Sequence, residues 1–205
     1  MDTLFDPALY AQLYNCSFYT ISSIPLAKRQ HIPLGIFYLA CFVLCESLYL
    51  PCMVIIFRQC RNDSQSSCYR IMFYIGVADI TALWISGFYT GAGAIAGWVF
   101  CSAPSLNYWM GMLGEALWAS ETTGTVVLAL NRVLSLLQPR VCDALFGSNR
   151  KMWVWLAVVA VYSFYYGFFN PPIIFSAVIA AWSYNPHQGY YDDSVYSTKH
   201  AYVSP

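Results

Sequence analysis

The chain has 205 residues, of which 59% are hydrophobic and only 10% are charged. Ordinary soluble domains carry about 25% charged residues, because charges keep a folded surface dispersed in water. Ten Lys and Arg residues balance ten Asp and Glu residues, so the zero net charge offers no attraction for nucleic acid. This composition excludes a soluble enzyme and a disordered tail, and it predicts a membrane protein that does not bind nucleic acid.

Four apolar segments are each long enough to cross a bilayer, which takes about 20 mainly apolar residues in a helix. We predict an all-α membrane protein with four transmembrane helices, over residues 32–57, 71–96, 106–130 and 152–182. Pro51, Pro171 and Pro172 lie inside these segments and are expected to kink their helices. The first 30 residues contain charges and no continuous apolar run, so the tail over residues 1–31 is not a signal peptide.

Lys and Arg residues are concentrated in two of the predicted loops. Seven of the ten lie in or at the borders of loops 58–70 and 131–151, and the other three are Lys28, Arg29 and Lys199. Loops rich in Lys and Arg stay in the cytosol. We therefore predict that the tail over residues 1–31, the loop over 97–105 and the tail over 183–205 are extracellular.

Two glycosylation sequons provide a test of this orientation. Asn15-Cys16-Ser17 lies in the tail predicted to be outside, and Asn62-Asp63-Ser64 lies in a loop predicted to be inside. Glycans are attached on the lumenal side only, so we expect Asn15 to be modified and Asn62 to be free.

The eight cysteines do not form a CxxC pair of the kind that binds zinc or carries out redox chemistry. Three lie in the first apolar segment, and three more are predicted to face the reducing cytosol. Only Cys16 and Cys101 fall outside, where they either form a disulfide or remain two unpaired thiols.

Carboxylates inside a membrane segment are costly, and they usually face the bundle interior and mark function. Glu121 lies eleven residues before Arg132, so the two share a helix face with Glu121 roughly 16 Å deeper. Asp79 lies at a similar depth on the preceding segment, and the two carboxylates could approach each other. Glu115, in the outer half of its segment, is within reach of a ligand from outside, and Glu46 is in the middle of the first segment. The alternative for each is a protonated carboxyl that is hydrogen-bonded to a neighbouring helix.

Several motifs in chain order resemble those of the rhodopsin-like G-protein-coupled receptors. Asp79 follows Gly76-Val77-Ala78, Leu130-Asn131-Arg132 closes the third apolar segment, and Pro139 comes seven residues later. More specifically, the chain resembles the nematode serpentine chemoreceptors of class T. The segments that carry this likeness are Asn15-Cys16-Ser17, Tyr49-Leu50-Pro51-Cys52, Ser67-Cys68-Tyr69-Arg70-Ile71-Met72, Leu117-Trp118-Ala119-Ser120-Glu121, Leu128-Ala129-Leu130-Asn131-Arg132 and Asn185-Pro186-His187-Gln188-Gly189-Tyr190.

The resemblance implies a plasma-membrane receptor for small molecules or peptides that signals through a heterotrimeric G protein. Arg132, with Asn131 before it, would contact the G protein. Asp79 and Glu121 would line an internal sodium-type site. Cys101 would match the cysteine at the outer end of helix 3.

Three features depart from the superfamily pattern. Cys101 lies nearer Asp79 than expected, and its usual partner in the second outer loop is missing. Asn131 replaces the acid that precedes the arginine, so any lock on Arg132 should be weaker, because an amide does not form an ion pair. The sequence also stops at Pro205, so the chain looks like a receptor truncated after its fourth helix.

Two other functions stay open on the sequence alone. A small four-helix transport or channel subunit could use the membrane acids as a cation path, and a regulator that pairs with full-length receptors would need only packing faces. We expect no enzyme activity, cofactor or metal site, because the chain has no His/Cys metal spacing, nucleophile elbow or phosphate loop.

Overall fold

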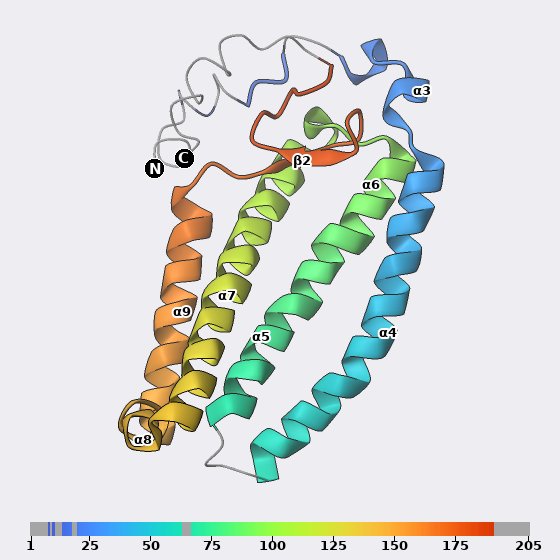
Figure 1. The fold of residues 1–205 in the computed structure, drawn as a ribbon. Helices are drawn as coiled ribbons and strands as arrows, with labels where there is room; N and C mark the ends of the chain where they lie inside the picture. The colour runs from blue at the N-terminus through green and yellow to red at the C-terminus, as the bar shows by residue number, and fades with distance from the viewer. Residues whose placement is uncertain (1–7, 9, 11–13, 18–19, 63–66, 191–205) are drawn as a thin grey trace.

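The structure is a computed structural model that describes residues 8, 10, 14–17, 20–62 and 67–190. Four long helical segments run side by side in chain order (Figure 1). They are α4 (Ile32–Asn62), the continuous run of α5 (Ser67–Leu83), the π-helical segment η2 (Trp84–Tyr89) and α6 (Thr90–Ala96), then α7 (Pro104–Leu137) and α9 (Asn149–Phe169). Short elements connect or cap them: η1 (Ile21–Ser23), α3 (Leu26–Arg29), η3 (Phe100–Ser102), α8 (Pro139–Phe146) and the strands β1 (Ile174–Ser176) and β2 (Ala181–Ser183).

Three helices in the described part of the chain are long and apolar enough to cross a membrane. They cover Leu26–Asn62, Ser67–Ala96 and Asn149–Phe169. The 34-residue α7 is the longest single helix, but it carries Glu115, Glu121 and Arg132 among Gly, Ser and Thr residues and is less apolar. It packs against α5 on one side and α9 on the other. The fold is therefore that of a helical membrane protein in which the most polar long helix is covered on both sides.

The fourth apolar segment is shorter as a helix than the sequence predicts. Helix α9 ends at Phe169, so the prediction of a helix over residues 152–182 is wrong, and Pro171 and Pro172 end the helix where a kink was expected. Proline lacks the backbone N–H that a helix needs and disfavours helical geometry in the residue before it. The apolar residues that follow form an antiparallel hairpin, in which Phe175 pairs with Trp182. Ile174 and Phe175 are fully buried, so their apolar character fits contact with protein and not with lipid.

The helices at the opposite end extend beyond the apolar segments. Helix α4 reaches Asn62, α5 begins at Ser67, and α7 continues to Leu137 before Pro139 opens α8. Most of the predicted loops 58–70 and 131–151 is therefore helical. Hydropathy marks the apolar part of a helix, whereas polar residues such as Arg and Gln continue the helix readily in water.

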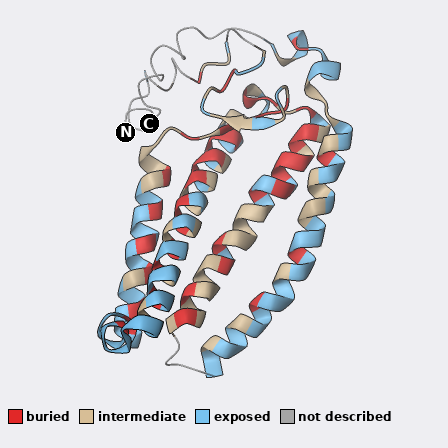
Figure 2. Cartoon of the chain, in the orientation of Figure 1, coloured by how far each residue is buried: buried red, intermediate tan, exposed pale blue. Residues whose placement is uncertain are grey.

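The hairpin covers one end of the bundle, which we call the hairpin end; the other is the α8 end. Figure 2 shows that the buried residues gather near the hairpin on α6 and α7, whereas α4 is largely exposed. Two bonds fix the hairpin: the backbone N–H of Ala177 donates to the carbonyl of Trp98 at 2.9 Å, and the indole N–H of Trp182 donates to Thr90 Oγ1 at 3.0 Å. Gly97 closes α6 with φ of +70°, a left-handed conformation that favours glycine.

Candidate functional site

Three polar side chains from three helices meet in the middle of the bundle; we call them the polar core. The hydroxyl of Tyr49 on α4 donates a hydrogen bond to the Asp79 carboxylate on α5. The Glu121 side chain on α7 is within hydrogen-bonding reach of the same Asp79 carboxyl. Two carboxyl groups this close share either a proton or a cation, because adjacent like charges repel each other. The polar core therefore links α4, α5 and α7 through groups that can gain or lose one charge.

The sequence places Asp79 and Glu121 at similar depths in the membrane and so predicts that they can meet. The structure brings these two side chains together. Tyr49 was missed, because a tyrosine in an apolar helix is usually part of the packing and its spacing carried no signal. Carboxylate and hydroxyl oxygens suit a hard cation such as sodium. Within residues 8–190 as described, no group of three or more His, Cys, Asp or Glu side chains is placed to hold a metal ion.

Glu46 lies one turn before Tyr49 on the same helix. It is buried, at 8% exposure, and its Oε1 atom has no hydrogen-bond partner within the described residues. Helix α4 thus carries a buried carboxyl one turn from Tyr49 of the polar core.

Asn131 and Arg132 lie together near the α8 end but face different surroundings. The Asn131 amide is 2% exposed and donates to Ser67 Oγ on α5 at 2.9 Å. The thiol of Cys142 on α8 donates to the Asn131 carbonyl at 3.7 Å. Arg132 is exposed. Asn131 therefore joins three helices at this junction, and of the two residues only Arg132 is accessible to a partner.

Glu115 lies under the hairpin. It is 5% exposed, and the Tyr184 hydroxyl, just after β2, donates to its Oε1 at 3.0 Å. Burial, together with the nearby Glu115 carboxylate, raises the pKa of Tyr184 to about 12, so the phenol stays a hydrogen-bond donor at physiological pH. The sequence identified Glu115 but not Tyr184, since their 69-residue separation leaves no local pattern.

Asn107 organises the loop between α6 and α7. Its amide is fully buried and donates to the carbonyls of Val99 and Phe100 at 3.3 and 3.2 Å. It also accepts a hydrogen bond of 2.6 Å from the Tyr89 hydroxyl at the end of η2. This buried network, which sequence reasoning missed, holds the start of α7 against η2 and the loop that follows α6.

A disulfide joins Cys16 to Cys101 in the structure, with their Cα atoms 5.7 Å apart. Beside it, Tyr14 is buried against Phe100, Tyr108 and Ile174. Asn15 stands next to the disulfide, and its side-chain oxygen accepts from the Ser17 N–H at 2.8 Å. The described part of the N-terminal tail is therefore anchored at the hairpin end.

Comparison with known proteins reveals the family. Residues 5–204 match the model of the serpentine type 7TM GPCR chemoreceptor family, Srt. The chain belongs to the Srt family. This confirms the resemblance to class T serpentine receptors, and it places the chain in a family of receptors and not of enzymes.

One Srt relative is the serpentine receptor class T-55 of Caenorhabditis elegans. It is 24% identical to this chain over 164 residues, which are 80% of the chain and 45% of the relative. The chain thus spans less than half the length of this curated Srt receptor. The Srt match covers all three parts of the site: the polar core, the Asn131–Arg132 pair and the hairpin end.

Proposed function

We propose that this chain forms the first four membrane-spanning helices of a chemosensory G-protein-coupled receptor in the plasma membrane. The spans are α4, the α5–α6 segment, α7 and α9, with the hairpin end outside. The observation that carries this proposal is the match to the Srt family over residues 5–204. The polar α7 is suited to a bilayer because it packs between α5 and α9, which shield it from lipid.

The orientation is supported by chemistry at both ends of the bundle. The Cys16–Cys101 disulfide lies at the hairpin end, and disulfides persist in oxidising compartments. Arg58, Arg61, Arg132, Arg140 and Arg150 lie toward the other end, and such clusters are retained in the cytosol.

Glycosylation mapping tests this orientation. We expect the chain expressed in insect cells to carry a glycan at Asn15 and none at Asn62, because only the hairpin end is exposed to the lumen. Mass spectrometry of the two peptides before and after glycosidase treatment makes the measurement. Glycosidase treatment should increase the gel mobility of the wild-type chain. Asn15→Gln should remove this mobility shift, and Asn62→Gln should leave it unchanged. A glycan at Asn62 would reverse the proposed orientation.

We propose that Arg132 contacts the G protein and that Asn131 positions it. Arg132 is exposed near the end of α7, where a cytosolic partner can reach it. The hydrogen bonds of Asn131 to Ser67 and Cys142 fix the α7 backbone next to Arg132. An amide supplies these bonds without an ion pair to Arg132, so the guanidinium is free to meet a partner.

Replacing Arg132 tests the coupling proposal. In the receptor expressed from the complete reading frame, we expect Arg132→Ala to lower G-protein activation at least tenfold, because a charge-assisted contact is lost. Activation is measured as nucleotide exchange on co-expressed G protein, with surface expression measured in parallel. Arg140→Ala removes an exposed arginine from α8 and should leave activation within twofold. Equal activation by Arg132→Ala and wild type would contradict the proposed contact between Arg132 and the G protein.

We propose that the ligand, a small molecule or a peptide, reaches the receptor at the hairpin end near Glu115. The carboxyl of Glu115 is buried under Tyr184, which comes from the hairpin and can move with it. A ligand that displaces Tyr184 would gain the carboxyl as a hydrogen-bond acceptor.

We propose that Asp79 and Glu121 form an internal sodium-type site, with Tyr49 as a further oxygen ligand. Sodium chloride should raise the melting temperature of the wild-type chain relative to choline chloride. A bound ion adds about 1.4 kcal/mol to the free energy of unfolding when its concentration is ten times its dissociation constant. Asp79→Asn keeps an oxygen to accept the Tyr49 hydrogen bond and removes the charge, so it should abolish this sodium effect. In the complete receptor the same change should also lower signalling. Sodium dependence that survives in Asp79→Asn would contradict the site.

A further inference from the structure

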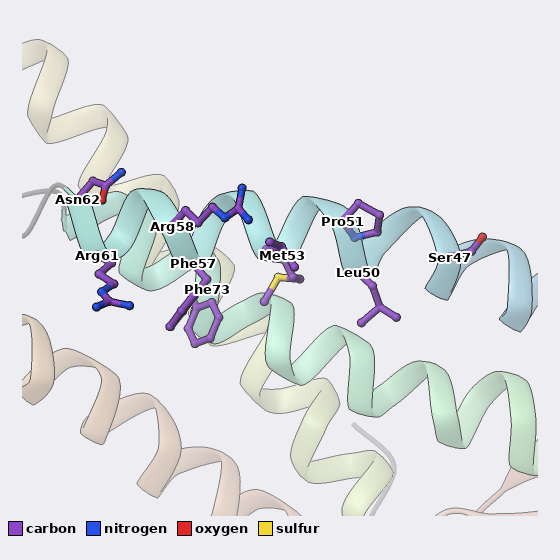
Figure 3. Close-up of a pocket in the computed structure, with 10 residues that line it drawn as sticks. Ser47, Leu50, Pro51, Met53, Phe57, Arg58, Arg61, Asn62 and Phe73 are labelled. Carbon is purple, nitrogen blue, oxygen red and sulfur yellow. The ribbon is translucent and has the colours of Figure 1, made fainter.

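A groove lies on the half of α4 nearest the α8 end. It has a volume of about 1090 Å³ and is open along one side. Its floor is apolar, with Leu50, Val54 and Phe57 from α4 and Phe73 from α5. Its rim carries Arg58 and Arg61 (Figure 3). Figure 3 shows Phe57 and Phe73 close together below α4, and their ring centroids are 5.5 Å apart.

The groove is amphipathic along its length. Arg61 lies eleven residues from Leu50, which corresponds to about 16 Å along the helix. This is close to half of the roughly 30 Å hydrocarbon core of a bilayer. If the guanidinium groups are at the headgroup level, the apolar floor reaches to about the bilayer midplane. A molecule that fills the groove therefore needs a charged head and an apolar tail of one leaflet's depth.

The arginines at the rim favour a bound molecule whose headgroup is negatively charged. Among the described residues that line the groove there is no Asp or Glu. Neither Arg58 nor Arg61 has a hydrogen bond or ion pair to any described residue, so each presents its full set of donors outward. Guanidinium groups bind phosphate through paired hydrogen bonds and give up water more readily than ammonium groups. Basic pockets between membrane helices on the cytoplasmic side are suited to anionic lipid headgroups.

We propose that this groove, formed by α4 and α5, binds an anionic phospholipid of the inner leaflet. Its phosphate meets Arg58 and Arg61, and one acyl chain lies over Leu50, Val54 and Phe57. The proposal rests on the orientation proposed above and is independent of ligand and G protein. A second copy of the chain fits less well, because a twofold-symmetric dimer through this face would bring the arginines of one copy toward those of the other.

Native mass spectrometry tests the proposal. The purified 205-residue chain is released from micelles that contain phosphatidylserine or phosphatidylcholine, and retained lipid is counted. We expect phosphatidylserine to be retained in preference to phosphatidylcholine. Each arginine near an anionic headgroup contributes about fivefold in affinity, so R58Q/R61Q should bind phosphatidylserine about 25-fold more weakly. The control R140Q/R150Q, two exposed arginines toward the same end of the bundle, should stay within twofold of wild type.

Several outcomes would overturn the proposal. They are equal retention of both lipids by wild type, unchanged binding by R58Q/R61Q, or an equal loss in R140Q/R150Q, which would indicate surface charge alone. A dimer that R58Q/R61Q abolishes would assign the groove to a second copy. Binding of glycerophosphoserine as tight as that of the lipid would remove the role of the acyl chain.

A measurement on wild type decides the case in which R58Q/R61Q fails to fold. Phosphatidylserine with a photoreactive group on its acyl chain is activated in the bound complex, and labelled peptides are mapped. We expect labels within residues 47–57 and at Phe73. Labels confined to α9 would overturn the proposal.

Discussion

Replacing Cys101 by serine is expected to lower the free energy of unfolding by about 3 kcal/mol, within the usual range for a native disulfide. The bridge closes a loop between residues 85 apart, for which loss of chain entropy gives about 4.5 kcal/mol. Helices that remain in the bilayer after unfolding shorten the effective loop, so the observed value should be smaller. The measurement is thermal unfolding of the purified chain, together with mapping of the Cys16–Cys101 peptide without reductant.

The controls use reductant and a second cysteine. Dithiothreitol should destabilise the wild-type chain by the same amount and leave Cys101→Ser unaffected, because no bridge remains to be reduced. Cys45→Ser removes an exposed free cysteine from α4 and should change stability by less than about 0.5 kcal/mol. A wild-type chain that reductant does not destabilise would contradict a stabilising bridge.

Replacing Gly111 by alanine is expected to destabilise the fold by about 3 kcal/mol, near the upper end of overpacking effects. A Cβ atom at this position would lie 1.8 Å from the backbone carbonyl oxygen of Ile173, so the chain that enters the hairpin must lift from α7. The hydrogen bond between Tyr184 and Glu115 depends on that contact and should be lost with it. A drop in melting temperature of roughly 6–12 °C is the expected result for a chain of this length.

Gly114 provides a matched control on the same helix. A Cβ atom there would meet its nearest neighbours, Ile173 and Ile85, at 3.9 and 4.0 Å, which is ordinary contact. Gly114→Ala should therefore stabilise the chain by about 0.5–1 kcal/mol, because glycine inside a helix costs more conformational entropy than alanine. Equal effects of the two changes would show that the hairpin does not press against α7 at Gly111.

Polar groups along α7 connect the two ends of the bundle. Glu115, Glu121 and Arg132 follow one another along α7, so this helix reaches from the hairpin to the α8 end. The polar core ties its middle to α4 and α5, and Asn131 ties its far end to α5 and α8. At the ligand site proposed above, a ligand that shifted α7 near Tyr184 would have to rearrange these contacts before the shift reached Arg132. For the receptor function proposed above, we therefore expect a change of charge in the polar core to alter signalling most.

The sequence by itself determined the membrane class, the family and the positions of most long helices. These follow from apolar runs and from motifs that are local in the chain, such as Leu130-Asn131-Arg132. The membrane acids were recognised for the same reason, since a carboxylate in an apolar segment is costly wherever the segment folds. Helix bounds were less well predicted, because polar residues extend a helix beyond its apolar part.

Only the tertiary structure decided which side chains meet. Tyr49 joins Asp79, and Tyr184 joins Glu115, across 30 and 69 residues of sequence, and neither pairing leaves a periodic signal. The segment over residues 174–183 is apolar enough to be mistaken for part of a membrane helix. Its apolar residues instead pack against α6 and α7 as a hairpin, because Pro171 and Pro172 end α9 and Gly111 lets the backbone approach α7 closely. Hydropathy records that a residue avoids water, and only the folded chain decides whether lipid or protein surrounds it.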